Sequence, residues 1–193
     1  MASSRPALYI DLGSPYAYLA LERADSALGT APELEPVLLG AIFSRRGFGS
    51  WAATPARAGR VAEIESRAQR YGLPPLSWPD AWPADGLQAM RCAIWAKQQG
   101  AGDAFARAVF RRQFVHGGDI SRRELLLESA EDAGLSPREA SRAIERAQVK
   151  RSLREATDAA WDAGVRGVPS LRVGDSIFYG DDQLELAALA LRG

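Results

Sequence analysis

The chain has 193 residues, 47% of them hydrophobic, which is enough to bury the core of one large domain. Lysine plus arginine and aspartate plus glutamate number 24 each, so the charge balance does not support a nucleic acid or an anionic membrane as the main partner. A single cysteine, Cys92, excludes an internal disulfide, and one cysteine with one histidine excludes a structural zinc cluster, so no metal is expected.

The N-terminal part of the chain predicts a strand, a helix and a second strand. Residues 7–12 are apolar and β-prone, and they end at the turn Gly13-Ser14-Pro15, too early for the apolar core of a signal peptide. Helical sequence follows from Tyr16 to Leu28, with Ser14 at the N-cap. Residues 34–39 indicate a second strand, parallel to the first. No apolar run is long enough to span a bilayer, and we expect a soluble, cytoplasmic protein.

The middle of the chain has almost no strand pattern. Helices are expected over residues at about 55–72, 86–99, 102–115, 121–133 and 137–163. A crossover between parallel strands needs only about a dozen residues beyond them. The region over residues 43–150 is therefore expected to be a helical subdomain inserted into the fold, and the helix at about 150–163 is expected to pack on the sheet.

The C-terminal part predicts a hairpin and a closing helix. Residues 169–173 and 176–179 are strand candidates separated by the turn signal Gly174-Asp175. Residues 182–192 have a helical pattern, with Asp181 or Asp182 expected at the N-cap.

The first candidate functional feature is the junction between the first strand and the first helix. Backbone N–H groups at a helix start are unpaired and the helix dipole is positive there, so this place stabilises an anion such as a thiolate. The hydroxyl of Ser14 adds a hydrogen-bond donor. In the alternative interpretation, Ser14 only caps the helix.

Two further candidate features lie near the C-terminal hairpin. A cis bond between Val168 and Pro169 would free backbone groups to pair with an extended, peptide-like ligand, whereas a trans proline at a strand start is the ordinary alternative. Asp181 and Asp182 precede the last helix, where one carboxylate can bind a ligand ammonium group while helix N–H groups bind its carboxylate. A plain acidic N-cap is the alternative there.

In this order, these segments resemble the thioredoxin-like family that contains 2-hydroxychromene-2-carboxylate isomerases and kappa-class glutathione transferases. The resemblance is carried by residues 11–20, 38–43, 70–74, 167–169 and 178–182, which span nearly the whole chain. It implies an α/β, DsbA-like thioredoxin fold with a large all-helical insertion domain. Residues 1–42 and 164–193 would form the thioredoxin-like domain, residues 43–150 the insertion, and the protein would be a homodimer.

The resemblance also implies glutathione as the cofactor and suggests its contacts. In the family, the serine after the first strand stands where disulfide oxidoreductases keep the first cysteine of their CxxC motif, so Ser14 would donate a hydrogen bond to the glutathione thiolate. Val168, beside a cis Pro169, would pair through its backbone with the cysteinyl part. Asp181 and Asp182 would receive the γ-glutamyl end.

The sequence departs from the family pattern in the expected substrate pocket, which the loops of the insertion supply. Phe48 stands in place of a family asparagine that helps to bind glutathione and substrate. Asp85 stands in place of another asparagine, where a carboxylate would repel a substrate carboxylate. Tyr16 and Trp82 are the other candidates for this pocket.

These features together predict a glutathione-dependent isomerase that acts on a small, aromatic or conjugated carbonyl substrate. A kappa-type glutathione transferase would use the same binding residues, and a non-catalytic thioredoxin-fold binding module is the other alternative. A thiol–disulfide oxidoreductase is rejected, because Ser14 and Ala17 occupy the two CxxC positions. Cys92 is expected to be a buried structural thiol and His116 a polar loop residue.

Overall fold

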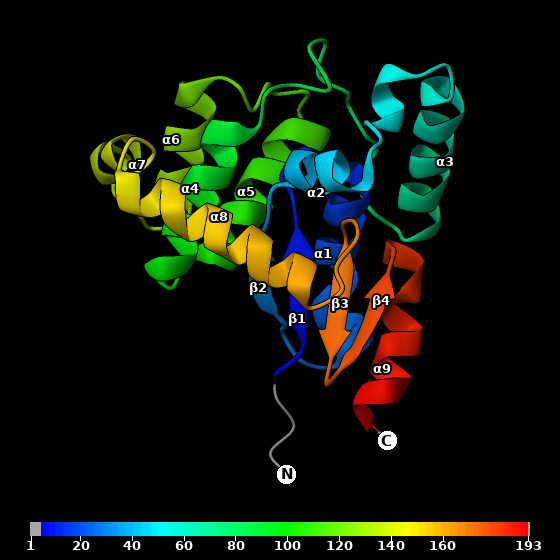
Figure 1. Cartoon of the computed structure of the whole chain (residues 1–193). Helices are drawn as coiled ribbons and strands as arrows, with labels where there is room; N and C mark the ends of the chain where they lie inside the picture. The colour runs from blue at the N-terminus through cyan, green and yellow to red at the C-terminus, as the bar shows by residue number, and fades with distance from the viewer. Residues whose placement is uncertain (1–4, 193) are drawn as a thin grey trace.

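The computed structural model describes residues 5–192 and places helices on both faces of a four-stranded mixed sheet (Figure 1). Residues 1–4 and Gly193, the ends of the expected thioredoxin-like domain, lie outside the described residues. The strands are β1 (Ala7–Ile10), β2 (Glu33–Pro36), β3 (Ser170–Val173) and β4 (Ser176–Tyr179), in the spatial order β2-β1-β3-β4. β1 is parallel to β2 and antiparallel to β3, and β3 and β4 form a hairpin. The parallel opening pair and the closing hairpin are therefore confirmed.

The helical elements account for most of the chain between β2 and β3. The α-helices are α1 (Pro15–Leu28), α2 (Leu39–Arg46), α3 (Arg57–Arg70), α4 (Leu87–Gln98), α5 (Gly102–Phe114), α6 (Arg123–Asp132), α7 (Pro137–Ala143), α8 (Ala147–Asp162) and α9 (Leu184–Arg192), and the 3-10 turns are η1 (Trp51–Ala53) and η2 (Asp181–Gln183). Within residues 5–192, no helix combines the length and the apolar character needed to cross a bilayer.

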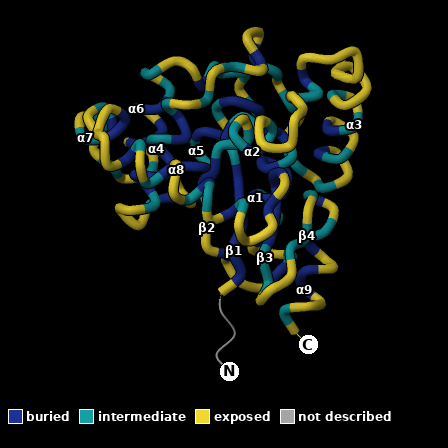
Figure 2. The backbone as a smooth tube through the Cα atoms, viewed as in Figure 1, coloured by how far each residue is buried: buried dark blue, intermediate teal, exposed yellow. Residues whose placement is uncertain are grey.

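Strand β1 is buried on both faces, which explains its unbroken apolar sequence (Figure 2). Leu8 and Ile10 point into the main core, where residues of α1, α4, α5 and α9 also pack. Ala7 and Tyr9 point to the opposite face, into a smaller cluster that includes Ala160 of α8. The alternation of side chains along one strand therefore anchors helices on both sides of the sheet.

The second strand is shorter than predicted, and a helix follows it that the sequence analysis did not predict. The strand expected over residues 34–39 ends at Pro36. The N–H of Val37 still donates to the carbonyl of Ile10 on β1 at 2.9 Å, and the N–H groups that follow it leave the sheet. The N–H of Leu38 donates to Oγ1 of Thr157 at 3.0 Å, and the N–H of Leu39 donates to Oδ2 of Asp11 at 2.9 Å. Val37 is buried and Leu38 and Leu39 are partly buried, as they would also be in a strand, so the apolar composition alone did not distinguish a strand end from a helix start.

The long helix expected over residues at about 137–163 is two helices, α7 and α8. The chain turns between them, where the N–H of Arg146 donates to the carbonyl of Ala143, three residues earlier, at 3.0 Å. Ile144 is fully buried within this turn. The apolar pattern therefore continues from α7 into α8, and for this reason the sequence predicted one helix instead of two.

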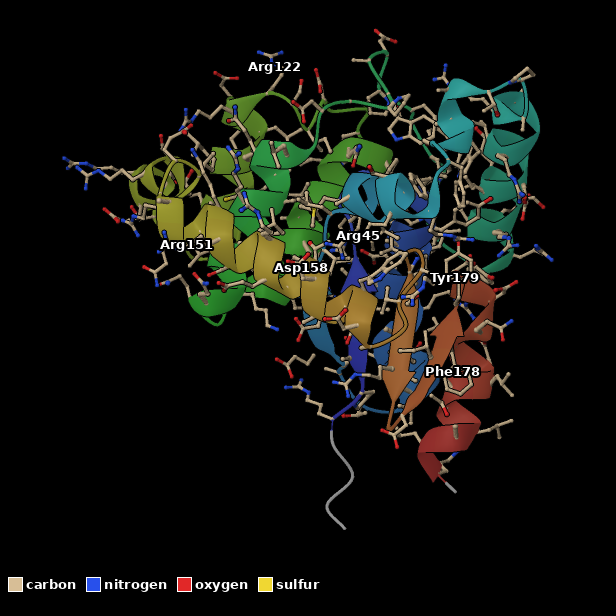
Figure 3. All side chains as sticks on the ribbon, in the orientation of Figure 1. Arg45, Arg122, Arg151, Asp158, Phe178 and Tyr179 are labelled. Carbon is tan, nitrogen blue, oxygen red and sulfur yellow. The ribbon has the colours of Figure 1, made fainter. Side chains whose placement is uncertain are left out.

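Helix α2 is tied to the helix that covers the same face of the sheet. Arg45, near its C-terminal end, forms an ion pair with Asp158 of α8 (Figure 3). Because both side chains are substantially exposed, this pair contributes little to stability, about 0–1 kcal/mol. The ion pair nevertheless shows that the C-terminal end of α2 lies beside α8.

Candidate active site

One large pocket, of about 660 Å³, lies where the sheet domain, which is the four strands with α1 and α9, meets the helices inserted after β2. The sheet domain lines it with the start of α1, the Val168–Pro169 loop and the end of β4, and the insertion lines it with α2, η1, α3 and the Trp82–Pro83 loop. Among the residues that line the pocket are Ser14, Tyr16, Phe48, Trp51, Glu63, Arg67, Trp82, Val168, Pro169, Asp181 and Asp182. All but one of the residues proposed from the sequence therefore line one pocket.

Ser14 is both the cap of α1 and part of the pocket lining. It has an extended conformation, and its Oγ accepts a hydrogen bond from the N–H of Ala17 at 3.3 Å. Its side chain is nearly buried, with 5% of the residue exposed. An acceptor role for Oγ leaves the hydroxyl hydrogen available to a ligand. The two interpretations of Ser14 are therefore compatible.

Asp11 stabilises the part of the pocket around the start of α1, a role that could not be recognised from the sequence. Its Oδ1 accepts from the N–H of Gly13 at 2.8 Å, and its Oδ2 accepts from the N–H of Leu39 at 2.9 Å. Burial raises the pKa of Asp11, and the two backbone hydrogen bonds oppose that rise. One side chain therefore holds the turn before α1 and the start of α2 together.

The loop before β3 has the predicted backbone conformation. The Val168–Pro169 bond is cis, and Val168 and Pro169 both line the pocket. The carbonyl of Pro169 accepts from the N–H of Gly180 at 3.0 Å, which joins this loop to the residues that follow β4. The Trp82–Pro83 bond is also cis, and both of its residues line the pocket.

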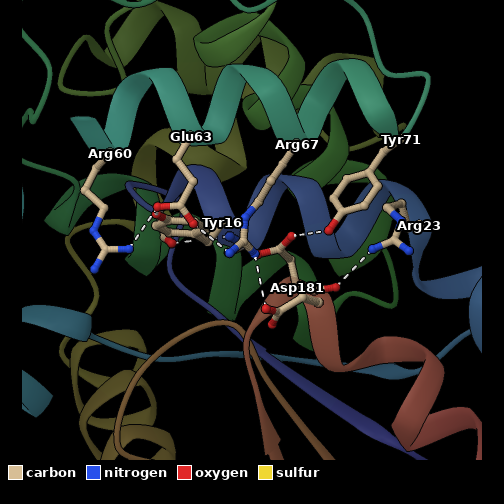
Figure 4. Close-up of polar contacts among 10 residues, drawn as sticks. Tyr16, Arg23, Arg60, Glu63, Arg67, Tyr71 and Asp181 are labelled. Atoms are coloured by element: carbon tan, nitrogen blue, oxygen red, sulfur yellow. Dashed lines mark hydrogen bonds and ion pairs between the residues drawn. The ribbon is translucent and has the colours of Figure 1, made fainter. Parts of the chain in front are cut away.

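Asp181 is enclosed by hydrogen bonds and does not cap the last helix, contrary to expectation (Figure 4). Its Oδ1 accepts from Nη1 of Arg67 at 2.8 Å, and its Oδ2 accepts from the hydroxyl of Tyr71 at 2.9 Å. Only 1% of the residue is exposed. Burial raises the pKa of Asp181, while Tyr71 and Arg67 lower it. Both carboxylate oxygens thus connect α3 to the end of β4.

Asp182 does not cap the helix either, but it remains accessible. Its side chain is 52% exposed, and its Oδ2 lies 3.5 Å from Nη1 of Arg67. Gly180, whose φ of +115° is unfavourable for residues with a side chain, turns the chain from β4 into η2. Of the two aspartates, Asp182 is the one whose carboxylate can meet a ligand.

A row of charged residues on α3 was missed by the sequence analysis. Glu63 accepts at Oε2 from Arg60 at 2.9 Å and at Oε1 from Arg67 at 2.6 Å. Burial raises the pKa of Glu63, but the hydrogen bonds from the two arginines outweigh it and hold the pKa below its ordinary value. The spacing of three and four residues places these side chains on one helix face, which is the signal that could have found them.

Aromatic side chains form one wall of the pocket. The ring centroids of Tyr16 and Trp51 are 6.1 Å apart, and those of Trp51 and Trp82 are 5.5 Å apart. Nε1 of Trp82 donates to the carbonyl of Gly13 at 3.2 Å, which joins the wall to the turn before α1. Phe48 is 47% exposed at the pocket rim. The wall suits a flat apolar group.

Asp85 is the candidate that the structure does not bring to this pocket. Its Oδ1 accepts from the N–H of Leu87 at 2.9 Å, so it serves the start of α4. The expectation that it belongs to the substrate pocket is therefore corrected: a short acidic side chain two residues before a helical N–H forms a local turn bond.

The remaining titratable candidates lie apart from the main pocket. Cys92 is fully buried, and burial raises the pKa of its thiol to about 12, so it is an inert structural thiol as expected. His116 is exposed beside a second hollow that Arg112 and Asp132 also line. Among the described residues, no group of acidic, histidine and cysteine side chains gathers in a way that could hold a metal ion.

A β-strand that leads into a capped helix start, opposite a cis-proline loop on a four-stranded mixed sheet, defines a protein of the thioredoxin fold. The model of the DSBA-like thioredoxin domain matches residues 7–192, and the chain belongs to this family.

The individual relatives share a low sequence identity with this chain. The chain is 27% identical over 183 residues to 2-hydroxychromene-2-carboxylate isomerase of Sphingobium xenophagum, with 92% of each protein covered. A solved 2-hydroxychromene-2-carboxylate isomerase has a TM-score of 0.87 at 20% identity, covering 97% of this chain and 94% of its own. Cytosolic disulfide reductase DsbM of Pseudomonas aeruginosa, solved with GSH, has a TM-score of 0.61 at 16% identity, covering 97% and 95%. At these identities the two structures show a shared fold.

Proposed function

We propose that this protein is an isomerase that uses glutathione and acts on a small aromatic or conjugated carbonyl compound. The observation that carries the proposal is the position of Ser14, at the nearly buried start of α1 and inside the large pocket. The relative from Sphingobium xenophagum, which is named as an isomerase, supports the reaction type. The DsbM structure solved with GSH supports a thiol ligand for this fold.

The residues of the pocket fit glutathione chemically. The N–H groups at the start of α1 and the hydroxyl of Ser14 suit an anionic sulfur. Arg67 and Asp182, one cation and one accessible anion, suit a zwitterionic end group. When bound, glutathione would supply a nucleophilic sulfur that the chain lacks and that is regenerated after the rearrangement.

The chain itself contributes binding, orientation and charge stabilisation. Ser14 donates its hydroxyl hydrogen toward the anionic sulfur, and the helix dipole lowers the energy of that charge. Trp51 and Trp82 hold the flat part of the substrate and exclude water from it. The backbone beside Pro169 offers an edge for a peptide-like ligand.

The chain's own thiol plays no part in this proposal. Cys92 is the only cysteine in the sequence, and it is a buried residue of α4 with a raised thiol pKa. A thiol–disulfide exchange reaction needs an accessible thiolate at the start of the first helix, where Ser14 stands.

The test has two stages. Glutathione at millimolar concentration is expected to raise the melting temperature, because a ligand that binds only the folded state stabilises it by about 2.7 kcal/mol at a hundred times its Kd. The loaded protein is then incubated with 2-hydroxychromene-2-carboxylate and the products are separated. An isomer with glutathione recovered supports the proposal, and a stable glutathione adduct indicates a transferase. No thermal shift at all would favour a non-catalytic binding module.

A further inference from the structure

Tyr16 occupies a distinctive place in the pocket. It lies two residues after Ser14 in the first turn of α1, and its ring packs edge-on against Trp51. Figure 4 shows it beneath α3, beside Glu63 and between Arg60 and Arg67. It therefore lies at the junction of the charged row on α3 and the aromatic wall.

The hydroxyl of Tyr16 is weakly held. It donates to Oε2 of Glu63 at 3.4 Å, near the upper limit for a hydrogen bond. Both oxygens of Glu63 already accept shorter bonds, from Arg60 at 2.9 Å and from Arg67 at 2.6 Å. The Tyr16 hydroxyl can therefore exchange Glu63 for a ligand oxygen at small cost, because the arginines continue to satisfy the carboxylate.

The surroundings of Tyr16, burial first of all, keep its hydroxyl protonated. Burial and the negative charge of Glu63 raise the pKa of Tyr16, and Arg60 and Arg67 oppose this rise. The guanidinium carbon of Arg67 lies 5.6 Å from the centre of the Tyr16 ring. The phenol is thus a neutral donor, and Arg60 and Arg67 pair with the negative charge of the neighbouring Glu63. This is a suitable setting for an oxygen that gains negative charge.

Building on the proposed function, we propose that Tyr16 is a catalytic residue that donates a hydrogen bond to the carbonyl oxygen of the substrate. When the conjugated carbon of the substrate accepts an electron pair, the π electrons shift along the conjugated system and the carbonyl pair moves onto its oxygen. The O–H of Tyr16 stabilises that oxygen and keeps its own proton. When the bond to the nucleophile breaks, the pair returns and the carbonyl is restored, so no further reactant is needed.

The position of Tyr16 favours the substrate over the sulfur as its partner. The anionic sulfur has its own donors in Ser14 and the N–H groups at the start of α1. Tyr16 instead contacts Trp51, which continues the aromatic wall toward Trp82. A flat conjugated substrate lying on this wall would bring its carbonyl oxygen toward α3.

The test compares Tyr16→Phe with Tyr9→Phe, a control tyrosine on β1 whose hydroxyl accepts from Nε of Arg172 outside the pocket. Tyr16→Phe keeps the ring against Trp51, so its melting temperature is expected to stay near that of the wild type. With 2-hydroxychromene-2-carboxylate and glutathione, we expect kcat to fall by about a hundredfold, as for loss of one oxyanion donor. KM is expected to change by less than about threefold, and the control to keep both values.

Two measurements without turnover accompany the kinetics. The ultraviolet absorbance of the bound glutathione thiolate, followed against pH, is expected to be the same in Tyr16→Phe and in the wild type. Binding of 4-nitrophenolate, an aromatic oxyanion, is expected to weaken by about tenfold in Tyr16→Phe, the loss of one charge-assisted hydrogen bond.

The outcomes separate the two proposals. An altered thiolate titration in Tyr16→Phe would assign Tyr16 to the sulfur and overturn its role with the substrate, as would an unchanged kcat while glutathione still binds. Failure of the wild-type protein to bind glutathione overturns the proposed function, and the role of Tyr16 with it.

Discussion

Arg67 and Asp181 are 114 residues apart in the chain, and their side chains meet at 2.8 Å between Nη1 and Oδ1. The contact joins α3, in the insertion, to the turn after β4, in the sheet domain. The same guanidinium donates to Glu63 at 2.6 Å, and the backbone carbonyl of Asp181 accepts from Arg23 of α1 at 3.0 Å. One buried residue, Asp181, thus fixes the charged side of the pocket through its carboxylate and contacts α1 through its backbone carbonyl.

Asp181→Ala is expected to lower the free energy of unfolding by about 3 kcal/mol, because it removes the buried carboxylate that accepts hydrogen bonds from both Arg67 and Tyr71. Urea denaturation measures the change. Asp182→Ala, at the accessible neighbour, is the matched control and is expected to stay within about 0.5 kcal/mol of the wild type. Equal losses in the two variants would contradict the role given to Asp181.

Asp182→Asn is expected to weaken glutathione binding by about tenfold, because a carboxylate that pairs with an ammonium group is replaced by a neutral amide. Calorimetric titration measures the Kd. Asp158→Asn, which removes an exposed carboxylate paired with Arg45 outside the pocket, controls for the loss of one surface charge. An unchanged Kd in Asp182→Asn would show that the γ-glutamyl end binds elsewhere.

Ser14→Ala is expected to lower glutathione-dependent activity by about tenfold or more, through loss of a donor to the anionic sulfur. It also removes a helix cap, so the free energy of unfolding is expected to fall by about 1 kcal/mol. Ser136→Ala is a close control: Ser136 caps α7 and is likewise followed by a proline at the first helical position. That variant should lose similar stability and keep its activity. If Ser14→Ala behaves in the same way, Ser14 is only a cap.

Cys92 is expected to resist thiol reagents in the folded protein, because burial raises its thiol pKa to about 12. The thiol titrates near pH 9 when unfolded, so the unfolded state loses this proton first as the pH rises. The stability contribution of Cys92 is therefore fully present below about pH 9 and is lost as the pH rises toward about 12.

The pH dependence is measured by urea denaturation of the wild type and of Cys92→Ala. The variant should show a shallower fall of stability at alkaline pH, and labelling of the wild-type thiol at neutral pH should follow global unfolding. Fast labelling of the folded protein would contradict the assignment of Cys92 as an inert core residue.

Much of the sheet domain could be predicted from the sequence, because its signals are local. The apolar run of β1, the Ser14-Pro15 start of α1 and the Gly174-Asp175 hairpin turn each depend on neighbouring residues. The start of α2 could not be predicted in this way. The N–H of Leu39 is satisfied by Asp11, which lies 28 residues earlier in the chain and reaches it only in the folded protein.

In the candidate site, too, some features could be predicted from local sequence and others could not. The sequence by itself determined the capped helix start at Ser14, and with the family resemblance it indicated the cis bond before Pro169, since both follow from residue types at adjacent positions. Only the tertiary structure decided that Asp181 is enclosed by α3 while Asp182 stays accessible. Residue type specifies what a side chain can bind, but its partner depends on which helix packs beside it, and that packing is set by burial over the whole chain.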